Sequence, residues 1–338
     1  MLNTRNGRAR PLTSLPLIAL VFLALAVMLA LMLVALTGCG SKTSSSTSPS
    51  TSPITVTDDS GKSVTLKAPA KRIVSLAPAN TEIAFALGAG DKMVGGTTYD
   101  DYPAAAKSLP KIGDFNNPNV EKVVNQAPDL VLAAGGIQAI LRAKFEKLGI
   151  PVFVVDPQTL DQTMTDLTKL GRLMGVSDKA DKVVTSMKAT IKSVQDKIFA
   201  YFARSDVSPE QAKTVKFRPT VFFEVYPKPL MTAGRDTFVN DLITLAGGAN
   251  IGAAAGPGYP TFSSEVLFQK NPDFYIAPIG SMSDPGQISA RPGYKELKAV
   301  KDGHVYTIED DLVVRPGPRL AQGLEQIAKM IHPEAFTK

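Results

Sequence analysis

The stretch "VEKVVNQAPDLVLAA", from Val120 to Ala134, returns later in the chain as "SEVLFQKNPDFYIAP", from Ser264 to Pro278. Each copy places a glutamate seven residues before a Pro-Asp pair and then continues into an apolar run. The spacing before the proline predicts a short amphipathic helix, and the apolar run predicts a buried strand. The chain therefore contains one helix–turn–strand unit twice, which indicates two similar halves.

Each half also begins in the same way. A short apolar strand at 72–76 is broken by a proline and followed by a helix that ends near Gly88. A second apolar run at 220–226 is followed by a proline-containing turn and a helix over 236–248. Strands that alternate with helices are typical of parallel sheets covered by helices. The sequence predicts an α/β fold with two similar lobes, each a mainly parallel sheet flanked by helices.

Between the halves, six apolar residues recur at helical spacing, with Lys and Asp between them: Val183, Val184, Met187, Ile191, Val194 and Ile198. This pattern predicts one long rigid helix that joins the lobes. Before the first strand, alternating β-branched residues around Asp59-Ser60-Gly61 predict a hairpin over 54–66. We therefore expect an N-terminal lobe at 54–172, a connecting helix at 173–206 and a C-terminal lobe at 207–338.

The amino terminus has the pattern of a secretory leader. Its first 14 residues carry three arginines and no acid, and residues 15–36 are almost entirely apolar. "LTGC", ending at Cys39, resembles a bacterial lipobox, which implies cleavage after residue 38 and a lipid such as palmitate on Cys39. The alternative is a retained transmembrane helix, because about 20 apolar residues suffice to span a bilayer. Residues 39–53 are rich in Ser, Thr and Pro and should form a flexible tether.

Composition excludes several function classes. Three of the 37 basic residues lie in the leader, so the remaining 34 against 31 acidic residues leave +3, which does not favour a nucleic-acid partner. The chain has two histidines, His304 and His332, and one cysteine, which leaves little for metal ligation or general base catalysis. No phosphate loop, dinucleotide fingerprint or nucleophile elbow occurs. We expect no enzymatic activity, no resident metal and no cofactor.

Several segments together resemble one family. "KRIVSLAPANTEIAFALGAGDKMVGGTTYDDYP", "PNVEKVVNQAPDLVLA", "LMTAGRDTFVNDLITLAGGANI" and "RPGPRLAQGLEQIAKMIHPE" occur in order. They resemble the vitamin B12, iron-siderophore and haem binding proteins of ABC importers, the helical-linker class of periplasmic binding proteins, and the cobalamin branch most of all. The resemblance implies a monomeric substrate-binding protein. It would be anchored through Cys39 on the extracytoplasmic face of the membrane and would deliver a metal chelate to an ABC permease and its ATPase subunits.

In this family an exposed glutamate on each lobe docks onto arginines of the permease. The resemblance places these residues at Glu82 and Glu265. One charge pair on each lobe would fix orientation across a two-fold permease. Glu121 repeats the spacing of Glu265 but is not matched to a docking position.

The ligand should lie in a cleft between the lobes, beside loops that follow the strands. Resemblance to cobalamin carriers implies ligand contacts near Tyr99, Phe115, Ala134, Tyr226, Tyr259 and Leu312, and Arg235 follows a glycine on another such loop. Aromatic faces suit a flat macrocycle. The best-known cobalamin carrier has tryptophans there and this chain has none, although Phe115 and Tyr259 could replace two of them.

Three ligand classes stay open. A corrinoid fits the family branch, haem would use Tyr99, Tyr226 or Tyr259 as axial ligand, and a ferric siderophore would need clustered arginines. The candidates for such a cluster are Arg235, Arg291, Arg315 and Arg319, of which Arg319 opens the last helix and is expected to be structural. A lipid-anchored adhesin or structural surface protein is the alternative from another class. It would explain Cys39 and the tether but not the paired lobes.

Overall fold

The computed structural model describes residues 52–204, 218–280 and 284–337. The predicted leader, Cys39 and all but the end of the tether lie outside the described residues. The described residues form one compact unit. Its first strand begins at Ile54, where the folded part was predicted to start, whereas the lobe boundaries at 172 and 206 stay a prediction.

The N-terminal lobe contains a hairpin and a four-stranded sheet. Strands β1 (Ile54–Thr57) and β2 (Ser63–Leu66) pair antiparallel, as predicted. The sheet has the order β4 (Met93–Gly95), β3 (Ile73–Ser75), β5 (Leu130–Ala134), β6 (Val152–Val155), and all of its pairs are parallel. The helices of this lobe are α2 (Pro78–Ala86), α3 (Val120–Asn125), α4 (Ile137–Lys147) and α5 (Leu160–Met174).

The C-terminal lobe contains a second, mainly parallel sheet. Strands β7 (Thr220–Pro227), β10 (Phe274–Ile279) and β11 (Val305–Glu309) pair parallel, and β9 (Ala249–Asn250) joins β7 in the same sense. Strand β8 (Leu230–Thr232) pairs antiparallel with β7. The helices are α8 (Phe238–Leu245), α9 (Ser264–Lys270), α10 (Lys298–Lys301) and α11 (Leu320–Ile331). The predicted fold class is confirmed.

Short 3₁₀ helices occur in the loops of both lobes. Among the described residues they span Gly90–Lys92, Ala104–Ser108, Ile251–Ala255, Ile288–Ala290, Tyr294–Glu296, Asp310–Leu312 and Pro333–Phe336.

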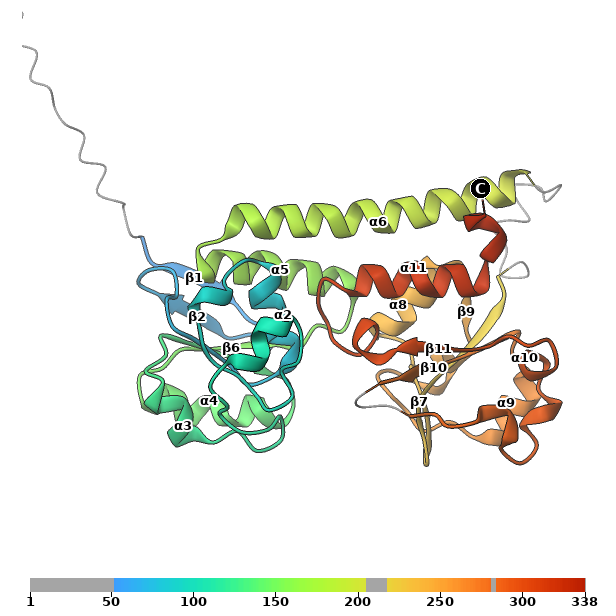
Figure 1. Ribbon diagram of the computed structural model, residues 1–338, viewed down its shortest axis with the longest axis horizontal. Coiled ribbons are helices and arrows are strands. Elements are labelled where there is room, and N and C mark those ends of the chain that lie inside the picture. The colour runs from blue at the N-terminus through green and yellow to red at the C-terminus, as the bar shows by residue number, and fades with distance from the viewer. Residues whose placement is uncertain (1–51, 205–217, 281–283, 338) are drawn as a thin grey trace, which may run out of the picture. The chain divides into compact units, whose positions relative to one another are not determined.

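The predicted long helix is α6 (Ser177–Arg204), which runs alongside α5 and α11 (Figure 1). It follows directly on α5, because Gly175 takes a left-handed conformation (φ 67°) that ends α5. Apolar residues of α6 such as Met187 and Val194 pack into a core that also contains residues of α5 and α11. The connecting helix is therefore held along its length by both lobes.

The sheets are buried on both faces, as parallel sheets require. Along β5, Leu130 and Leu132 enter the core beneath α5 and α6, whereas Val131 and Ala133 enter a second core against α3 and α4. A third core lies in the C-terminal lobe around Phe222 and Tyr275. Full burial of each large apolar side chain contributes roughly 1.5 to 3 kcal/mol.

The repeated unit has the same backbone in both lobes. Ala127 and Asn271, which precede the two Pro-Asp pairs, both take a left-handed conformation with φ of 45° and 44°. Asp129 then accepts hydrogen bonds from the N–H groups of the two residues before β3 (2.9–3.1 Å). Asp273 accepts the equivalent bond from Thr220 at the start of β7 (2.8 Å). The sequence repeat is therefore a structural repeat.

Candidate functional site

The predicted ligand residues of the N-terminal lobe lie at or after the carboxyl ends of its strands. Tyr99 follows β4 and its side chain is 56% exposed. Its loop is fixed by the buried Asp100, which accepts hydrogen bonds from Thr81 Oγ1 (2.7 Å) and from the Thr97 N–H (3.0 Å). Burial raises the pKa of Asp100, while these bonds oppose the rise. The loop thus presents the Tyr99 ring on a rigid base.

Phe115 and Ala134 are both half-buried, and one buried side chain connects them. Gln138, in the first turn of α4, bonds to the backbone of both residues. The sequence analysis did not identify Gln138. A glutamine at the start of a helix normally faces solvent, and nothing in the sequence indicates its bonds to Leu76 O and Phe115 O, which lie 62 and 23 positions away.

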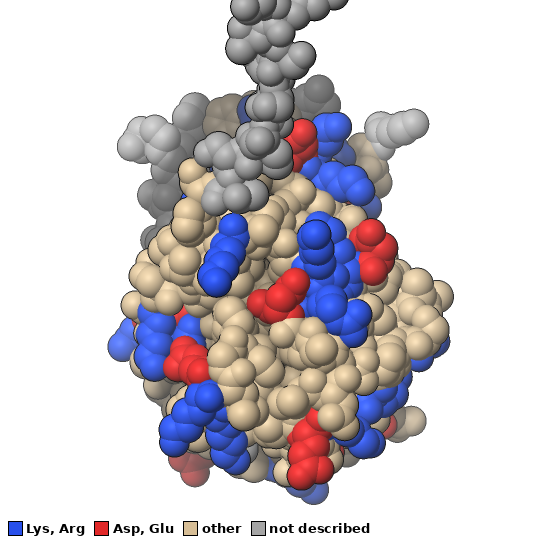
Figure 2. Space-filling model, turned by 90° about the vertical axis from the view of Figure 1, so that its left-hand side faces the viewer, with Lys and Arg blue, Asp and Glu red and all other residues tan. Residues whose placement is uncertain are grey.

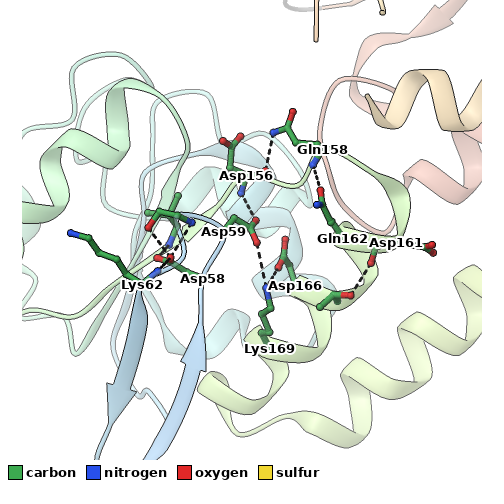
Figure 3. A network of polar contacts seen from close by, with 12 residues as sticks. Asp58, Asp59, Lys62, Asp156, Gln158, Asp161, Gln162, Asp166 and Lys169 are labelled. Carbon is green, nitrogen blue, oxygen red and sulfur yellow. Dashed lines mark hydrogen bonds and ion pairs between the residues drawn. The ribbon is translucent and has the colours of Figure 1, made fainter. Parts of the chain in front are cut away.

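The loop after β6 is held by the hairpin (Figure 3). Asp59, at the β1–β2 turn, accepts a hydrogen bond from the Asp156 N–H (2.6 Å). It also forms an ion pair with Lys169 of α5 (3.3 Å). Lys169 also pairs with the buried Asp166 (2.9 Å). Burial raises the pKa of Asp166 to about 7, and the nearby Asp59 contributes to the rise. Two carboxylates therefore share one ammonium group at this anchor.

In the C-terminal lobe, two predicted ligand loops are paired through their backbones. The Gly234 N–H donates to Gly258 O (2.8 Å), and the Arg235 N–H donates to Gly256 O (2.9 Å). A Cβ on Gly234 would lie 2.1 Å from Gly256 O, so only glycine permits this approach. Arg235 and Tyr259 are consequently brought together, and both side chains are exposed.

Two tyrosines of the C-terminal lobe are exposed. Tyr226, near the end of β7, is 53% exposed, and Tyr259 is 40% exposed. Desolvation raises the pKa of the Tyr259 hydroxyl, and the charge of Asp156 from the other lobe raises it further. Tyr259 therefore offers a neutral phenol next to the N-terminal lobe.

Leu312 is buried, which argues against its predicted contact with the ligand. Its side chain is 3% exposed and belongs to the core shared by both lobes. The close approach of Gly323 of α11, where a Cβ would lie 2.3 Å from Leu312 O, packs this turn onto the helix. The prediction failed because the 3₁₀ turn at Asp310–Leu312 directs the leucine inward.

Glu82 is not exposed, which corrects its predicted docking role. Its carboxylate is 2% exposed and accepts two hydrogen bonds from Arg319, Nε–Oε1 at 2.8 Å and Nη2–Oε2 at 2.6 Å. The Arg319 guanidinium also covers the ring of Tyr102, 4.0 Å from its centroid, and pairs with Asp311 (3.3 Å). Burial raises the pKa of Glu82, and Arg319 opposes this rise. The pair joins α2 to the start of α11, as the structural role expected for Arg319 implies.

Two other arginines expected near the ligand are also engaged. Arg315 is buried and pairs with Asp101 (2.8 Å) and Asp311 (2.7 Å). Arg291 pairs with the buried Glu224 and donates to Pro285 O. Of the four candidate arginines, Arg235 alone is exposed, with a side chain that is 57% accessible. The described residues therefore do not form the predicted arginine cluster.

Glu265 is exposed in the first turn of α9, as the docking prediction requires. Its structural counterpart is Glu121, which is exposed in the first turn of α3. Both helices begin with a side-chain cap. Asn119 accepts a hydrogen bond from the Lys122 N–H (2.9 Å), and Ser263 accepts one from the Glu265 N–H (3.2 Å). Glu121, rather than Glu82, occupies the matching position in the N-terminal lobe.

Neither histidine lies at this edge. His304 precedes β11 and stacks on Phe274 at 4.6 Å, and His332 is buried at the end of α11 against Phe202. Within the part of the chain that the structure describes, no group of three His, Cys, Asp or Glu residues could hold a metal ion. On the face shown in Figure 2, Lys and Arg side chains lie in separate groups among neutral and acidic residues.

Comparison with known proteins identifies the family. The model of the periplasmic binding protein family matches residues 73–312. The chain belongs to this family. An ABC transporter substrate-binding lipoprotein of Bacillus subtilis (strain 168) is 38% identical over 84% of this chain and 87% of its own length. A vitamin B12-binding protein of Yersinia pestis (strain Pestoides F) is 31% identical over 79% of this chain and 89% of its own length.

The solved structures agree with the fold. A periplasmic haem-binding protein of Roseiflexus sp. RS-1 superimposes with a TM-score of 0.65 at 26% identity, covering 78% of this chain and 99% of that one. The chain described here is thus a substrate-binding protein of an ABC transporter. Its family is not enzymatic, as predicted. Among residues 52–204, 218–280 and 284–337, no helix is long and apolar enough to cross a membrane.

Proposed function

We propose that this periplasmic binding protein captures a corrinoid such as cobalamin and delivers it to an ABC permease. The observation that carries the proposal is the set of exposed tyrosines: Tyr99 after β4, Tyr226 near the end of β7, and Tyr259 in the loop that pairs with the Arg235 loop. Tyrosine rings supply apolar contact area at low entropic cost and suit a flat macrocycle. The relationship to a vitamin B12-binding protein over most of the chain supports this ligand class.

Haem is the second candidate, because a haem-binding protein shares the fold at 26% identity. An axial tyrosine binds ferric iron as phenolate, and the raised pKa of Tyr259 disfavours that form. Tyr99 and Tyr226 would then be the axial candidates. A ferric siderophore is less well supported, because Arg291, Arg315 and Arg319 are held in ion pairs.

Titration calorimetry of the full chain in detergent tests the ligand, with cyanocobalamin, haemin and ferrichrome as probes. One-to-one binding of cyanocobalamin alone supports the proposal, and Tyr99→Ala and Tyr259→Ala should each weaken it by about tenfold. Binding of haemin alone, with a Soret band that shifts in Tyr99→Ala or Tyr226→Ala, would replace the corrinoid by haem. No binding of any probe would return the adhesin alternative.

Docking onto the permease is proposed for Glu121 and Glu265. The two carboxylates occupy equivalent positions in the repeated unit and are both exposed. Glu265 was expected in this role, and Glu121 replaces Glu82. One acid on each lobe can pair with basic residues on a two-fold permease and so set the orientation of the carrier.

Uptake of labelled cyanocobalamin by cells that carry only the variant protein tests this role. Glu121→Ala and Glu265→Ala should each keep the ligand affinity of the wild type while uptake falls, and the double variant should abolish uptake. Glu334→Ala, at another exposed glutamate, is the matched control. Normal uptake by the double variant would exclude the docking role.

Anchoring at the membrane is proposed through a lipid on Cys39, with the leader cleaved after residue 38. The support is the lipobox-like sequence and the description of the Bacillus subtilis relative as a lipoprotein. Mass spectrometry of the membrane-extracted protein decides this point. A diacylated Cys39 at the amino terminus supports the anchor, and an intact leader would support the retained helix.

A further inference from the structure

The Gln138 side chain is completely buried and makes three short hydrogen bonds. Its Oε1 accepts from the Ala134 N–H (2.7 Å), and its Nε2 donates to Leu76 O and to Phe115 O (2.7 Å each). An amide supplies an acceptor and two donors on one planar group, and this site uses all three functions. A carboxylate would lack the two donors, and an aliphatic side chain could make none of the three hydrogen bonds.

The three partners of Gln138 lie at the end of β5, directly after β3, and in the loop that connects β4 to α3. Leu76 follows β3, Phe115 lies in the loop after β4, and Ala134 ends β5. These strands are adjacent in the order β4, β3, β5. One side chain therefore ties the ends of β3 and β5 to the Phe115 loop, at the edge where ligands bind in such sheets.

The sheet itself does not depend on this contact. Strands β3 and β5 are already paired through their backbones, and the Leu76 N–H donates to Leu132 O (2.9 Å). The loop of Phe115 differs, because Asp114 ties it internally by accepting from the N–H groups of Asn116 and Asn117. The bond from Gln138 connects Phe115 itself to the ends of β3 and β5.

We propose that Gln138 is a positioning residue for the ligand, which sets the separation between the Phe115 and Ala134 backbones without touching the ligand itself. This inference rests on the proposed function, because Phe115 and Ala134 are ligand contacts only if the edge binds a ligand. It predicts that ligand affinity depends on the donor capacity of residue 138.

Two variants separate the donors from the acceptor. Gln138→Glu keeps the oxygen that faces the Ala134 N–H, and it can donate only when the carboxyl is protonated. Gln138→Leu has a similar volume and can make none of the three bonds. Gln195→Glu, at an exposed site on α6, is the matched control.

Calorimetry at pH 8 and pH 5 gives the first readout, with cyanocobalamin, haemin and ferrichrome as probes. The best probe should bind Gln138→Glu at least about tenfold more weakly than wild type at pH 8, because two buried carbonyls lose their donor. At pH 5 the deficit should shrink for Gln138→Glu and persist for Gln138→Leu. Equal affinities at pH 8, or the same pH response in both variants, would overturn the inference.

Amide hydrogen exchange of the ligand-free protein gives the second readout and needs no ligand. The segment around Phe115 should exchange faster in both variants at pH 8, whereas segments of α6 and α11 should match the wild type. Uniformly faster exchange would indicate a general loss of stability and overturn the positioning role. If the wild type binds no probe, the proposed function fails, and the exchange data still decide whether Gln138 orders this loop.

Discussion

The two lobes secure the segment after the repeated unit with different chemistry. In the N-terminal lobe, β5 leads into α4, where the neutral Gln138 joins the ends of β3 and β5 to the Phe115 loop. In the C-terminal lobe, β10 leads into a segment where Arg291 pairs with Glu224 and donates to Pro285 O. Tyr275 of β10 donates to the same buried carboxylate. The chain that follows the repeated unit thus carries an amide contact in one lobe and an ionic contact in the other.

This difference shows that the repeat conserves the backbone and leaves the anchoring free to change. The Pro-Asp turns share their φ angles and their aspartate bonds, because both strands must begin in the same way. The ionic contact costs more to break, since a buried charge without a partner is expensive. The amide contact carries no charge of its own and should be less sensitive to pH and salt. Four predictions test these expectations.

The largest effect is expected at the ionic contact. Arg291→Met keeps much of the side-chain volume but leaves the Glu224 carboxylate, which is 1% exposed, without its cation. We expect a loss of about 3 kcal/mol in the free energy of unfolding, measured by urea denaturation at pH 7. The double variant with Glu224→Gln should recover part of this loss. A single variant that loses under about 1 kcal/mol would contradict a buried ion pair of this weight.

A smaller effect is expected at the amide contact. Gln138→Leu leaves two carbonyl groups without a donor, and we expect a loss of about 1.5 kcal/mol in the same urea assay. The test is that Arg291→Met loses more unfolding free energy than Gln138→Leu, because the absolute size of each loss depends on its surroundings. A loss equal to that of Arg291→Met would remove the distinction between the lobes.

The pH dependence of stability should reveal the anchor of the β6 loop. The native protein holds a proton on Asp166 up to about pH 7, whereas the unfolded chain releases it near pH 4. Stability from this group is therefore complete at low pH and falls as the pH rises from about 4 to 7. Solvent reaches the partly exposed Lys169 and screens its pair with Asp166. We therefore expect the unfolding free energy to fall by only roughly 1 kcal/mol across this range.

Asp166→Asn should remove this contribution, so its unfolding free energy should depend less steeply on pH than that of the wild type. Parallel urea titrations at pH 4, 5.5 and 7 measure the difference. Identical slopes for the two proteins would show that Asp166 ionises normally in the native state.

The smallest effect is expected on the exposed face of α6. Lys192 and Asp196 form an ion pair one helical turn apart, and both side chains are more than 60% accessible. Lys192→Ala should change the unfolding free energy by no more than about 0.5 kcal/mol, because solvent screens the pair. A loss above 1 kcal/mol would mean that surface ion pairs contribute as much as the buried contacts.

Much of the fold could be predicted from the sequence because it depends on local periodicity. The hairpin, the repeated unit and α6 each have a pattern of apolar residues within one continuous stretch. The placement of Tyr99, Tyr226 and Tyr259 near the ligand came from the family resemblance, and that of Arg235 from its position after Gly234 on a loop. Their exposure confirms that they are accessible, and their contacts with a ligand stay a prediction.

The failures concern contacts between residues far apart in the chain. Glu82 and Arg319 are 237 positions apart, so nothing near Glu82 indicates that it is buried. Glu82 is the fifth residue of α2, and the family resemblance that assigned its docking role gave no sign that Arg319 covers it. The repeat itself contained the signal for Glu121, because it aligns that residue with Glu265 in every feature of the unit. Leu312 failed because the direction of a side chain in a tight turn does not follow from periodicity.

Ala134 has a consequence for protein engineering. It is half-buried at the end of β5, its backbone is held by Gln138, and the whole chain contains no tryptophan. A tryptophan introduced there would be the sole indole of the molecule and would stand at the edge where the ligand is proposed to bind. Its fluorescence would report occupancy without any background from other indoles. The carrier is in this respect a ready scaffold for an optical biosensor.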